Sequence, residues 1–508
     1  MKKKLKTRDI IQLCAMGLIG ASVLTANVIL NVPIGDGIKL SSLITNYLYG
    51  SGINYENSET FKEAIAQSKD LNIKIGEEGI VMVRNERNTL PIAKESLKKI
   101  NVFGWSSTKG GWVCGSDGSA NSNSGASRLK VKDLITVLND PSVGIETNTE
   151  LTKMYEDFCK TRATDQSGNL IRALAQNPNY YQLTEPTRDY YDRPGANGKT
   201  ILENAKNFSS TALVVLSRLG GEGTDLPYKQ IKNDDGKKTY VGSDFLIDDT
   251  RTYLDVTTEE EAMLKMCKDN FEKVIVLVNS CNEMNLKFLE DYDIDACLTV
   301  NGLGENGAFA IPKILTGETN PSGKTTSTHP YDLSLDASFA NGGAKTADSQ
   351  KFATYLEDIY VGYKWFETAD AMGYWNDVSN QYGNGYDGVV QYPFGYGLSY
   401  SKFQWELAEL SAIDQDGNRI KVGEDFIDEN TKFTVKVNVT NNSDIPGKDV
   451  VQLYVNPPYY QRGIEKSSVN LLAFAKTGLI PAHKSSTVTL TFSGYDFASY
   501  DCYDKNQS

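Results

Sequence analysis

The chain has 508 residues, a net charge of −13, 40% hydrophobic residues and 23% charged residues. This length predicts about three domains, and the composition is that of a folded globular protein. The acidic charge argues against nucleic-acid binding, which needs a basic surface. Seven irregularly spaced cysteines and two histidines predict neither a disulfide framework nor a metal site, and we expect no cofactor. Any catalysis must therefore depend on carboxylates.

The first 34 residues differ in character from the rest of the chain. A basic segment, residues 1–8, precedes an apolar stretch from Ile10 to Val32. A helix of this length would extend about 35 Å, enough to cross a bilayer. We predict a single-pass signal-anchor over residues 1–34, with the basic flank in the cytoplasm and the remaining chain outside the cell. Secretion after cleavage of a signal peptide is the alternative.

An α/β pattern follows this segment. Residues 35–74 are predicted as a linker that ends in a helix, because apolar residues between Ser58 and Ile75 recur at helical spacing. Strands and helices then alternate, which predicts a mostly parallel sheet covered by helices on both faces. The predicted strands are Lys99–Gly104, Thr211–Ser217, Lys273–Asn279 and Ala296–Val300, and the predicted helices are Leu129–Leu138, Glu150–Thr161, Thr257–Asp269 and Ala308–Thr316.

The last part of the chain, residues 403–508, reads as an all-β domain. Short alternating runs are separated by turn residues, which is typical of an immunoglobulin-like or fibronectin III-like sandwich. A complete sandwich of this type has about seven strands, so with five predicted strands we expect this domain to be truncated. The predicted strands are Trp405–Ala412, Lys432–Thr440, Val450–Val455, Leu471–Ala475 and Thr487–Phe492.

One glutamate stands out as a candidate reactive acid. Glu222 lies between two glycines, directly after the predicted strand Thr211–Ser217. Functional residues in open α/β sheets lie at the carboxyl ends of strands, and the glycines let the loop approach other groups without a side-chain clash. As an isolated residue, Glu222 would more often belong to an ordinary surface turn.

Nine ordered segments give this glutamate a context. They are Glu77–Glu86 with Leu90–Pro91, Asn101–Ser107, Gly221–Asp225, Val276–Asn279, Gly304–Gly307, Asn320–Lys324, Glu357–Lys364, Pro393–Tyr400 and Asn441–Tyr454. Together they resemble glycoside hydrolase family 3. The resemblance implies an (α/β)6-type sandwich over residues 75–402, then a fibronectin type III-like domain over residues 403–508.

The resemblance also implies an activity and a missing partner domain. Family members carry a TIM-type barrel that supplies the nucleophilic aspartate, and in permuted members this barrel comes last. About 70 residues precede the sandwich, too few for a barrel. We therefore expect the nucleophile outside residues 1–508, on a barrel downstream in cis or in trans. The implied function is a retaining β-glucosidase acting on terminal non-reducing β-linked sugars, and the chain alone is expected to be inactive.

Two glutamates compete for the acid/base role that the resemblance implies. Glu222 matches the loop that carries this residue in β-glucosidase-like members and is our first choice. Glu305, which follows the predicted strand Ala296–Val300, is the runner-up, because other members place the acid in this second loop. A residue at the start of a helix, stabilised by the helix dipole, is its simpler interpretation. The family pattern continues with Asp-Arg, whereas this chain has Asp225 followed by Leu226.

Other residues are expected at the rim of a sugar site or are set aside. Trp105, Trp112 and Asp225 are predicted to border the substrate, although a buried position is the commoner fate of a tryptophan. Asp244 resembles the setting of the nucleophile but lies in the wrong domain. The alternative function is a non-catalytic cell-surface protein that keeps these domains to bind carbohydrate or a protein partner.

Overall fold

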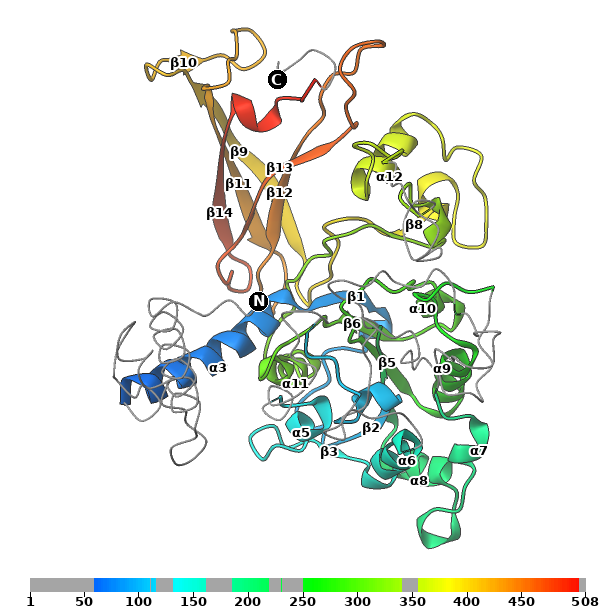
Figure 1. Cartoon of the computed structure of the whole chain (residues 1–508). Coiled ribbons are helices and arrows are strands. Elements are labelled where there is room, and N and C mark those ends of the chain that lie inside the picture. Colours follow the sequence, from blue (N-terminus) through cyan, green and yellow to red (C-terminus); the bar gives the residue numbers. More distant parts are fainter. Residues whose placement is uncertain are drawn as a thin grey trace, which may run out of the picture. The chain divides into compact units, whose positions relative to one another are not determined.

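The structure, a computed structural model, describes residues 59–109, 111–115, 131–160, 185–218, 230, 250–339 and 355–501. Residues Leu71–Ser508 form one compact unit. An α/β part comes first along the chain, and an all-β part follows it (Figure 1).

A six-stranded sheet forms the centre of the α/β part. Its strand order is β1-β6-β5-β4-β2-β3, and all neighbours are parallel except β1, which pairs antiparallel with β6. This arrangement confirms the prediction of a mostly parallel sheet. The strands are β1 (Val81–Asn85), β2 (Lys99–Phe103), β3 (Glu146–Thr147), β4 (Thr211–Leu216), β5 (Lys273–Val278) and β6 (Ala296–Thr299).

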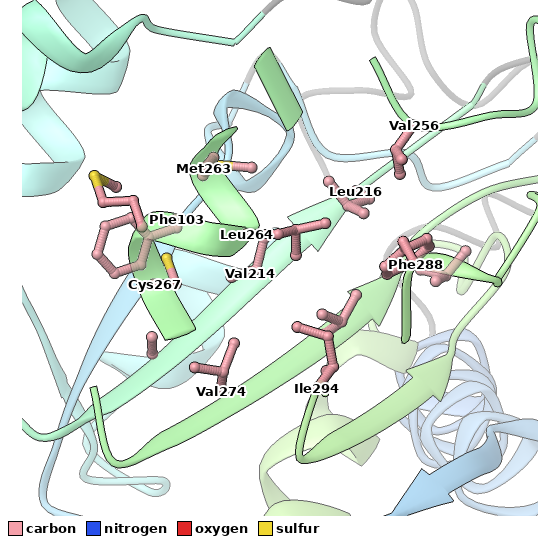
Figure 2. Packing of buried hydrophobic residues seen from close by; sticks show 14 of the residues in the cluster. Phe103, Val214, Leu216, Val256, Met263, Leu264, Cys267, Val274, Phe288 and Ile294 are labelled. Carbon is pink, nitrogen blue, oxygen red and sulfur yellow. The ribbon is translucent and has the colours of Figure 1, made fainter. Parts of the chain in front are cut away.

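The sheet is buried on both faces because its central strands, β4 and β5, are apolar at every position after the first. In β4, Val214 and Leu216 point into one hydrophobic cluster, whereas Leu213 and Val215 point into another. This alternation is the two-residue period of a strand. Figure 2 shows the first cluster, where Met263 and other residues of α9 (Thr258–Asn270) lie over β4 and β5.

Helices cover each face of the sheet, and α5, α6, α8 and α9 each begin after a residue whose side chain caps the helix. Leu151 of α6, Leu202 of α8 and Leu264 of α9 belong to the first cluster, and Leu134 of α5 and Ile311 of α11 belong to the second. Both α8 and α9 begin with a capping box. The helices are α3 (Glu59–Gly79), α5 (Leu134–Leu138), α6 (Thr149–Cys159), α7 (Arg188–Tyr191), α8 (Ile201–Phe208), α9 (Thr258–Asn270), α10 (Phe288–Asp291), α11 (Ala310–Leu315) and α12 (Tyr363–Ala371).

Two predicted helices begin later than expected. The helix predicted from Leu129 begins at Leu134, where the carboxylate of Asp133 accepts a hydrogen bond from the backbone N–H of Thr136 at 2.9 Å. The helix predicted from Ala308 begins at Ala310, after a 3-10 turn. Local capping and turn geometry, which apolar spacing does not report, set both starts.

The all-β part is an antiparallel sandwich, as predicted. One sheet has the order β10-β9-β11-β14, and the other consists of β12 and β13. Val435, Val439, Val451, Val488 and Leu490 are buried in its small core. All five predicted strands are present, and a two-residue strand joins them: β9 (Phe403–Ile413), β10 (Arg419–Ile420), β11 (Lys432–Asn441), β12 (Val450–Val455), β13 (Asn470–Lys476) and β14 (Ser485–Ser493).

A membrane-spanning segment was predicted near the N-terminus. Within the ranges given above, no helix combines the length and the apolar character needed to cross a bilayer. The apolar stretch from Ile10 to Val32 lies outside these ranges, so the signal-anchor stays a prediction.

Candidate active site

Four loops leave the sheet at the carboxyl ends of β2, β4, β5 and β6. Because these strands are parallel, the loops begin at one edge of the sheet, where open α/β proteins bind their ligands. The loops begin at Gly104, Ser217, Asn279 and Val300. The contacts between them define the candidate site.

The loop after β2 begins with a glycine that the packing requires. Gly104 has a φ of 92°, and a Cβ atom added there would lie 2.3 Å from the carbonyl oxygen of Val215 in β4. Only glycine tolerates this conformation and this close approach together. Two residues later, the hydroxyls of Ser106 and Ser217 lie 2.7 Å apart. The ends of β2 and β4 are therefore tied together.

The loop after β5 contributes a buried amide that joins three loops. The Oδ1 atom of Asn279 accepts a hydrogen bond from the backbone N–H of Val113 at 2.7 Å. Its Nδ2 group donates to the carbonyl oxygen of Val113 at 2.8 Å and to that of Asn301 at 3.0 Å. Asn279 is 0% exposed. This one side chain therefore links the loops after β2, β5 and β6.

The loop after β6 carries Glu305, the runner-up for the acid role. The backbone N–H of Gly304 donates to the carbonyl of Cys114 at 2.8 Å, and that of Lys132 donates to the carbonyl of Glu305 at 2.8 Å. The loop backbone is thus held on two sides. The side chain of Glu305 itself is exposed to solvent.

The loop after β4 begins with a buried cation. The guanidinium of Arg218 donates to both carboxylate oxygens of Glu260, at 2.8 and 2.6 Å. The exposed fractions of the two side chains are 0% and 3%. Burial alone would lower the pKa of Arg218, but the charge and hydrogen bonds of Glu260 outweigh it and raise that pKa. The guanidinium of Arg218 therefore keeps its charge inside the protein.

Arg218 also binds backbone carbonyls, and one of them is shared with Gln230. Its Nε atom donates to the carbonyl of Tyr253 at 2.7 Å, and its Nη2 atom donates to that of Asp255 at 2.5 Å. The Nε2 group of Gln230 donates to the same Asp255 carbonyl at 2.9 Å. The residues on either side of segment 219–229 are therefore fixed to one point ahead of α9.

Several predicted site residues can now be placed. Glu222, Asp225 and Asp244 lie outside the described residues. Trp105 and Trp112 are described and are 4% and 0% exposed, with their rings in the two clusters that cover the sheet. The contact of both tryptophans with a sugar stays a prediction, as do the roles of Glu222 and Asp225.

Sequence reasoning missed the residues that support the loops. Arg218 opens the motif that contains Glu222, yet its partner Glu260 is distant in sequence. One signal was present, because Thr257 and Glu260 have the spacing of a capping box. Glu260 does accept a hydrogen bond from the backbone N–H of Thr257 at 2.8 Å. The same carboxylate also accepts hydrogen bonds from Arg218. No local sequence pattern indicates this second contact.

Comparisons with known proteins agree with this architecture. Residues 80–400 match the glycosyl hydrolase family 3 C-terminal domain, and residues 449–506 match a fibronectin type III-like domain. Beta-glucosidase A of Butyrivibrio fibrisolvens is 32% identical over 435 residues, which cover 84% of this chain and 45% of that protein. A beta-glucosidase of Ruminococcus albus is 30% identical over 302 residues, covering 59% of this chain and 25% of the relative.

Solved structures show the same likeness. The structure of beta-glucosidase 3B from Thermotoga neapolitana in complex with glycerol has 25% identity and a TM-score of 0.61, over 97% of this chain and 56% of that chain. A beta-glucosidase from Paenibacillus barengoltzii has 26% identity and the same TM-score, over 85% of this chain and 39% of its own. The chain thus spans about half, or less, of the length of these relatives.

Proposed function

Because the chain belongs to glycoside hydrolase family 3, we propose that it forms the acid/base part of a retaining β-glucosidase that removes terminal, non-reducing, β-linked glucose. The observation that carries this proposal is the continuous family match over residues 80–400, which includes both candidate acids. The relatives named above that span most of this chain are β-glucosidases.

The proposed reaction uses two carboxyl groups in two steps. In the first step, a nucleophilic carboxylate from outside these residues attacks the anomeric carbon, while the acid protonates the leaving oxygen and the glycosidic bond breaks. In the second step, the same residue takes a proton from water, the water oxygen attacks the anomeric carbon, and the nucleophile leaves. Net retention requires the two carboxyl groups about 5–5.5 Å apart.

We assign the acid/base role to Glu222 and keep Glu305 as the second candidate. Both follow the carboxyl end of a parallel strand, β4 for Glu222 and β6 for Glu305. Support for Glu222 comes from the buried contacts of Arg218 and Gln230, which hold both flanks of its segment. Glu305 lies on a loop whose backbone is held, but its side chain is exposed to solvent.

Two single variants of the full-length protein test this assignment. Glu222→Gln should slow cellobiose hydrolysis by about 10²–10⁴-fold, because an alkoxide leaving group needs protonation. The kcat/KM for dinitrophenyl β-glucoside, which reports only the first step, should fall far less, because the dinitrophenolate leaves without a proton. Glu305→Gln should leave the hydrolysis of both substrates close to that of the wild type. If Glu305→Gln showed the loss on cellobiose and Glu222→Gln did not, the acid/base role would belong to Glu305. Equal rates for both variants and the wild type would reject the proposed function.

We further propose that the protein is held at the cell surface by residues 1–34, with the rest of the chain outside. The basic start and the apolar stretch from Ile10 to Val32 support this orientation. Protease treatment of intact cells should remove the glucosidase domains and leave a membrane-bound fragment. Recovery of the protein from the culture medium without its N-terminal apolar stretch would instead show a cleaved signal peptide.

A further inference from the structure

We propose that a cavity lined by Tyr382, Lys287 and Asp332 binds a neutral sugar, as a glucoside or a gluco-oligosaccharide. The ring of Tyr382 would pack against the sugar, and the two charged side chains would bind its hydroxyl groups. The choice of glucose as the sugar rests on the proposed function. The cavity itself is argued from residues that the structure describes.

The cavity lies beside loops that build the candidate site. Its volume is about 560 Å³, within the range of about 300–1,000 Å³ that is usual for small-molecule sites. Its walls fall within residues 250–255 and 285–287, which belong to the loops after β4 and β5, and within residues 331–339 and 378–389. Both loops leave the sheet at the edge where open α/β proteins bind ligands.

Two asparagines hold the walls of the cavity in place. The Nδ2 group of Asn285 donates to the carbonyl of Tyr331 at 3.1 Å, and its Oδ1 atom accepts from the backbone N–H of Lys287 at 3.0 Å. On the other wall, the Oδ1 atom of Asn380 accepts from the backbone N–H of Tyr382 at 2.9 Å. All of these residues line the cavity. A lining held in this manner lowers the ordering cost of binding.

A stacked pair of tyrosines supplies a flat surface. The ring centroids of Tyr331 and Tyr382 lie 4.0 Å apart, with 7° between the ring planes. The hydroxyl of Tyr331 donates to Glu290 at 2.7 Å, and that of Tyr382 donates to Asp291 at 2.8 Å, which fixes both rings. Tyr331 is 9% exposed, whereas Tyr382 is half-buried, so Tyr382 is the ring that a ligand can reach. Such a ring offers the C–H face of a sugar a large apolar surface.

The charges of the described lining favour a neutral, hydroxyl-rich ligand. Arg251 is paired with Glu261, and the carboxylate of Asp255 accepts hydrogen bonds from its own loop. The other two charged residues of the lining, Lys287 and Asp332, have opposite signs. A sugar hydroxyl can accept from the ammonium of one and donate to the carboxylate of the other. An anion site would instead need an excess of positive charge.

The test is protection of Lys287 from acetylation in the full-length wild-type protein. Peptide mass spectrometry measures the rate at which N-hydroxysuccinimide acetate modifies each lysine. Thiocellobiose is the probe, because its sulfur linkage resists hydrolysis. At about 10 mM, a ligand with a Kd of about 1 mM leaves about a tenth of the site free, so the rate at Lys287 should fall about tenfold. Lys421, which is 74% exposed in the all-β part, is the control and should react at an unchanged rate.

Variants of Tyr382 test the role of the ring. Tyr382→Leu should lose most of the protection of Lys287, whereas Tyr382→Phe keeps the ring and should retain it. Tyr495→Leu, at an exposed position of the all-β part, is the matched control and should behave as the wild type. Thermal unfolding shows which variants fold. The comparison of ligands on the wild type needs no variant, so it decides the inference even where Tyr382→Leu does not fold.

Inorganic phosphate at the same concentration should not protect Lys287. Protection by phosphate, no protection by thiocellobiose, equal protection of Lys287 and Lys421, or full protection in Tyr382→Leu would overturn the inference. Because acetylation needs no hydrolysis, this result is independent of the test with Glu222→Gln. No protection, with the expected loss of cellobiose hydrolysis in Glu222→Gln, would reject the sugar site alone. Protection without that loss would reject the acid/base assignment alone.

Discussion

Asn279 and Val113, 166 positions apart in the chain, are joined by two hydrogen bonds that use both backbone groups of the valine. The amide of Asn279 thus takes the place of a neighbouring strand. It holds the loop after β2 against the end of β5, although β4 separates these two strands in the sheet. The candidate site is built on loops whose backbones are fixed in this manner.

Asn279→Ala should therefore destabilise the protein. Truncation leaves the N–H and C=O of Val113 buried without this partner, which costs about 1–3 kcal/mol for an unsatisfied group. Urea unfolding followed by circular dichroism measures the change. Asn442→Ala, at an exposed position, should change the free energy of unfolding by less than about 0.5 kcal/mol. Equal effects of the two substitutions would show that the link is unimportant.

Gly104→Ala should destabilise the protein more than Gly144→Ala. Both glycines have positive φ angles, 92° and 71°, so alanine adds a conformational cost of about 1–2 kcal/mol at either site. At Gly104 the added methyl group would also meet the Val215 carbonyl, whereas no atom lies within 4 Å at Gly144. The difference in the free energy of unfolding should be about 1–3 kcal/mol. A difference in the free energy of unfolding near zero would mean that β2 and β4 can move apart at little cost in free energy.

Asp295 should make stability depend on pH. Burial alone would raise the pKa of this carboxyl, but hydrogen bonds from Lys268, Arg87 and the backbone N–H of Val274 outweigh it and lower the pKa. The ordinary value of an unfolded aspartate is about 3.9. A lowered pKa means that the stabilisation is complete above this value and is lost as the pH falls through the folded pKa.

The test compares Asp295→Asn with the wild type by urea unfolding from about pH 6 to about pH 3. The wild type should be more stable at the upper end, and the gap should narrow as the pH falls below about 4. Asp157→Asn, which removes an exposed pair with Lys153, should change stability much less. A gap that stays constant across this range would contradict the prediction.

The fold was largely predictable because its strong signals are local. Thr211–Leu216 and Lys273–Val278 are runs of β-branched and aliphatic residues long enough to identify buried strands. Other elements have too few residues, or too weak a sequence pattern, to be identified from the sequence. The two-residue strand β3 has no period to detect, and nothing in the sequence of β1 shows that it runs antiparallel to β6. The helix α8 had a usable signal, the capping box of Thr200 and Glu203.

The candidate site was less predictable because its contacts are distant in sequence. The motif around Glu222 pointed to the end of β4, and the resemblance supplied its chemical role. The partner of Arg218 is 42 positions away, and that of Asn279 is 166 positions away. Single-sequence patterns report neighbours along the chain, so they cannot pair such residues.

A polypeptide of residues 1–508 should show no glucosidase activity by itself. The resemblance assigns the nucleophile to none of these residues, and a positioned acid alone cannot form or break a glycosyl-enzyme. Hydrolysis of p-nitrophenyl β-glucoside by the purified polypeptide measures this. Turnover at ordinary enzyme rates, on the order of 1–10³ per second, would mean that the nucleophile lies within the chain.

The most direct test of the acid/base assignment is product analysis with azide. In the full-length Glu222→Ala variant, azide can enter the space left by the carboxylate and attack the anomeric carbon of the glycosyl-enzyme. A carbon–nitrogen bond then forms as the bond to the nucleophilic carboxylate breaks. With dinitrophenyl β-glucoside as substrate, NMR should identify β-glucosyl azide from Glu222→Ala and only glucose from Glu305→Ala. Azide product from Glu305→Ala alone, or wild-type hydrolysis by both variants, would contradict the account.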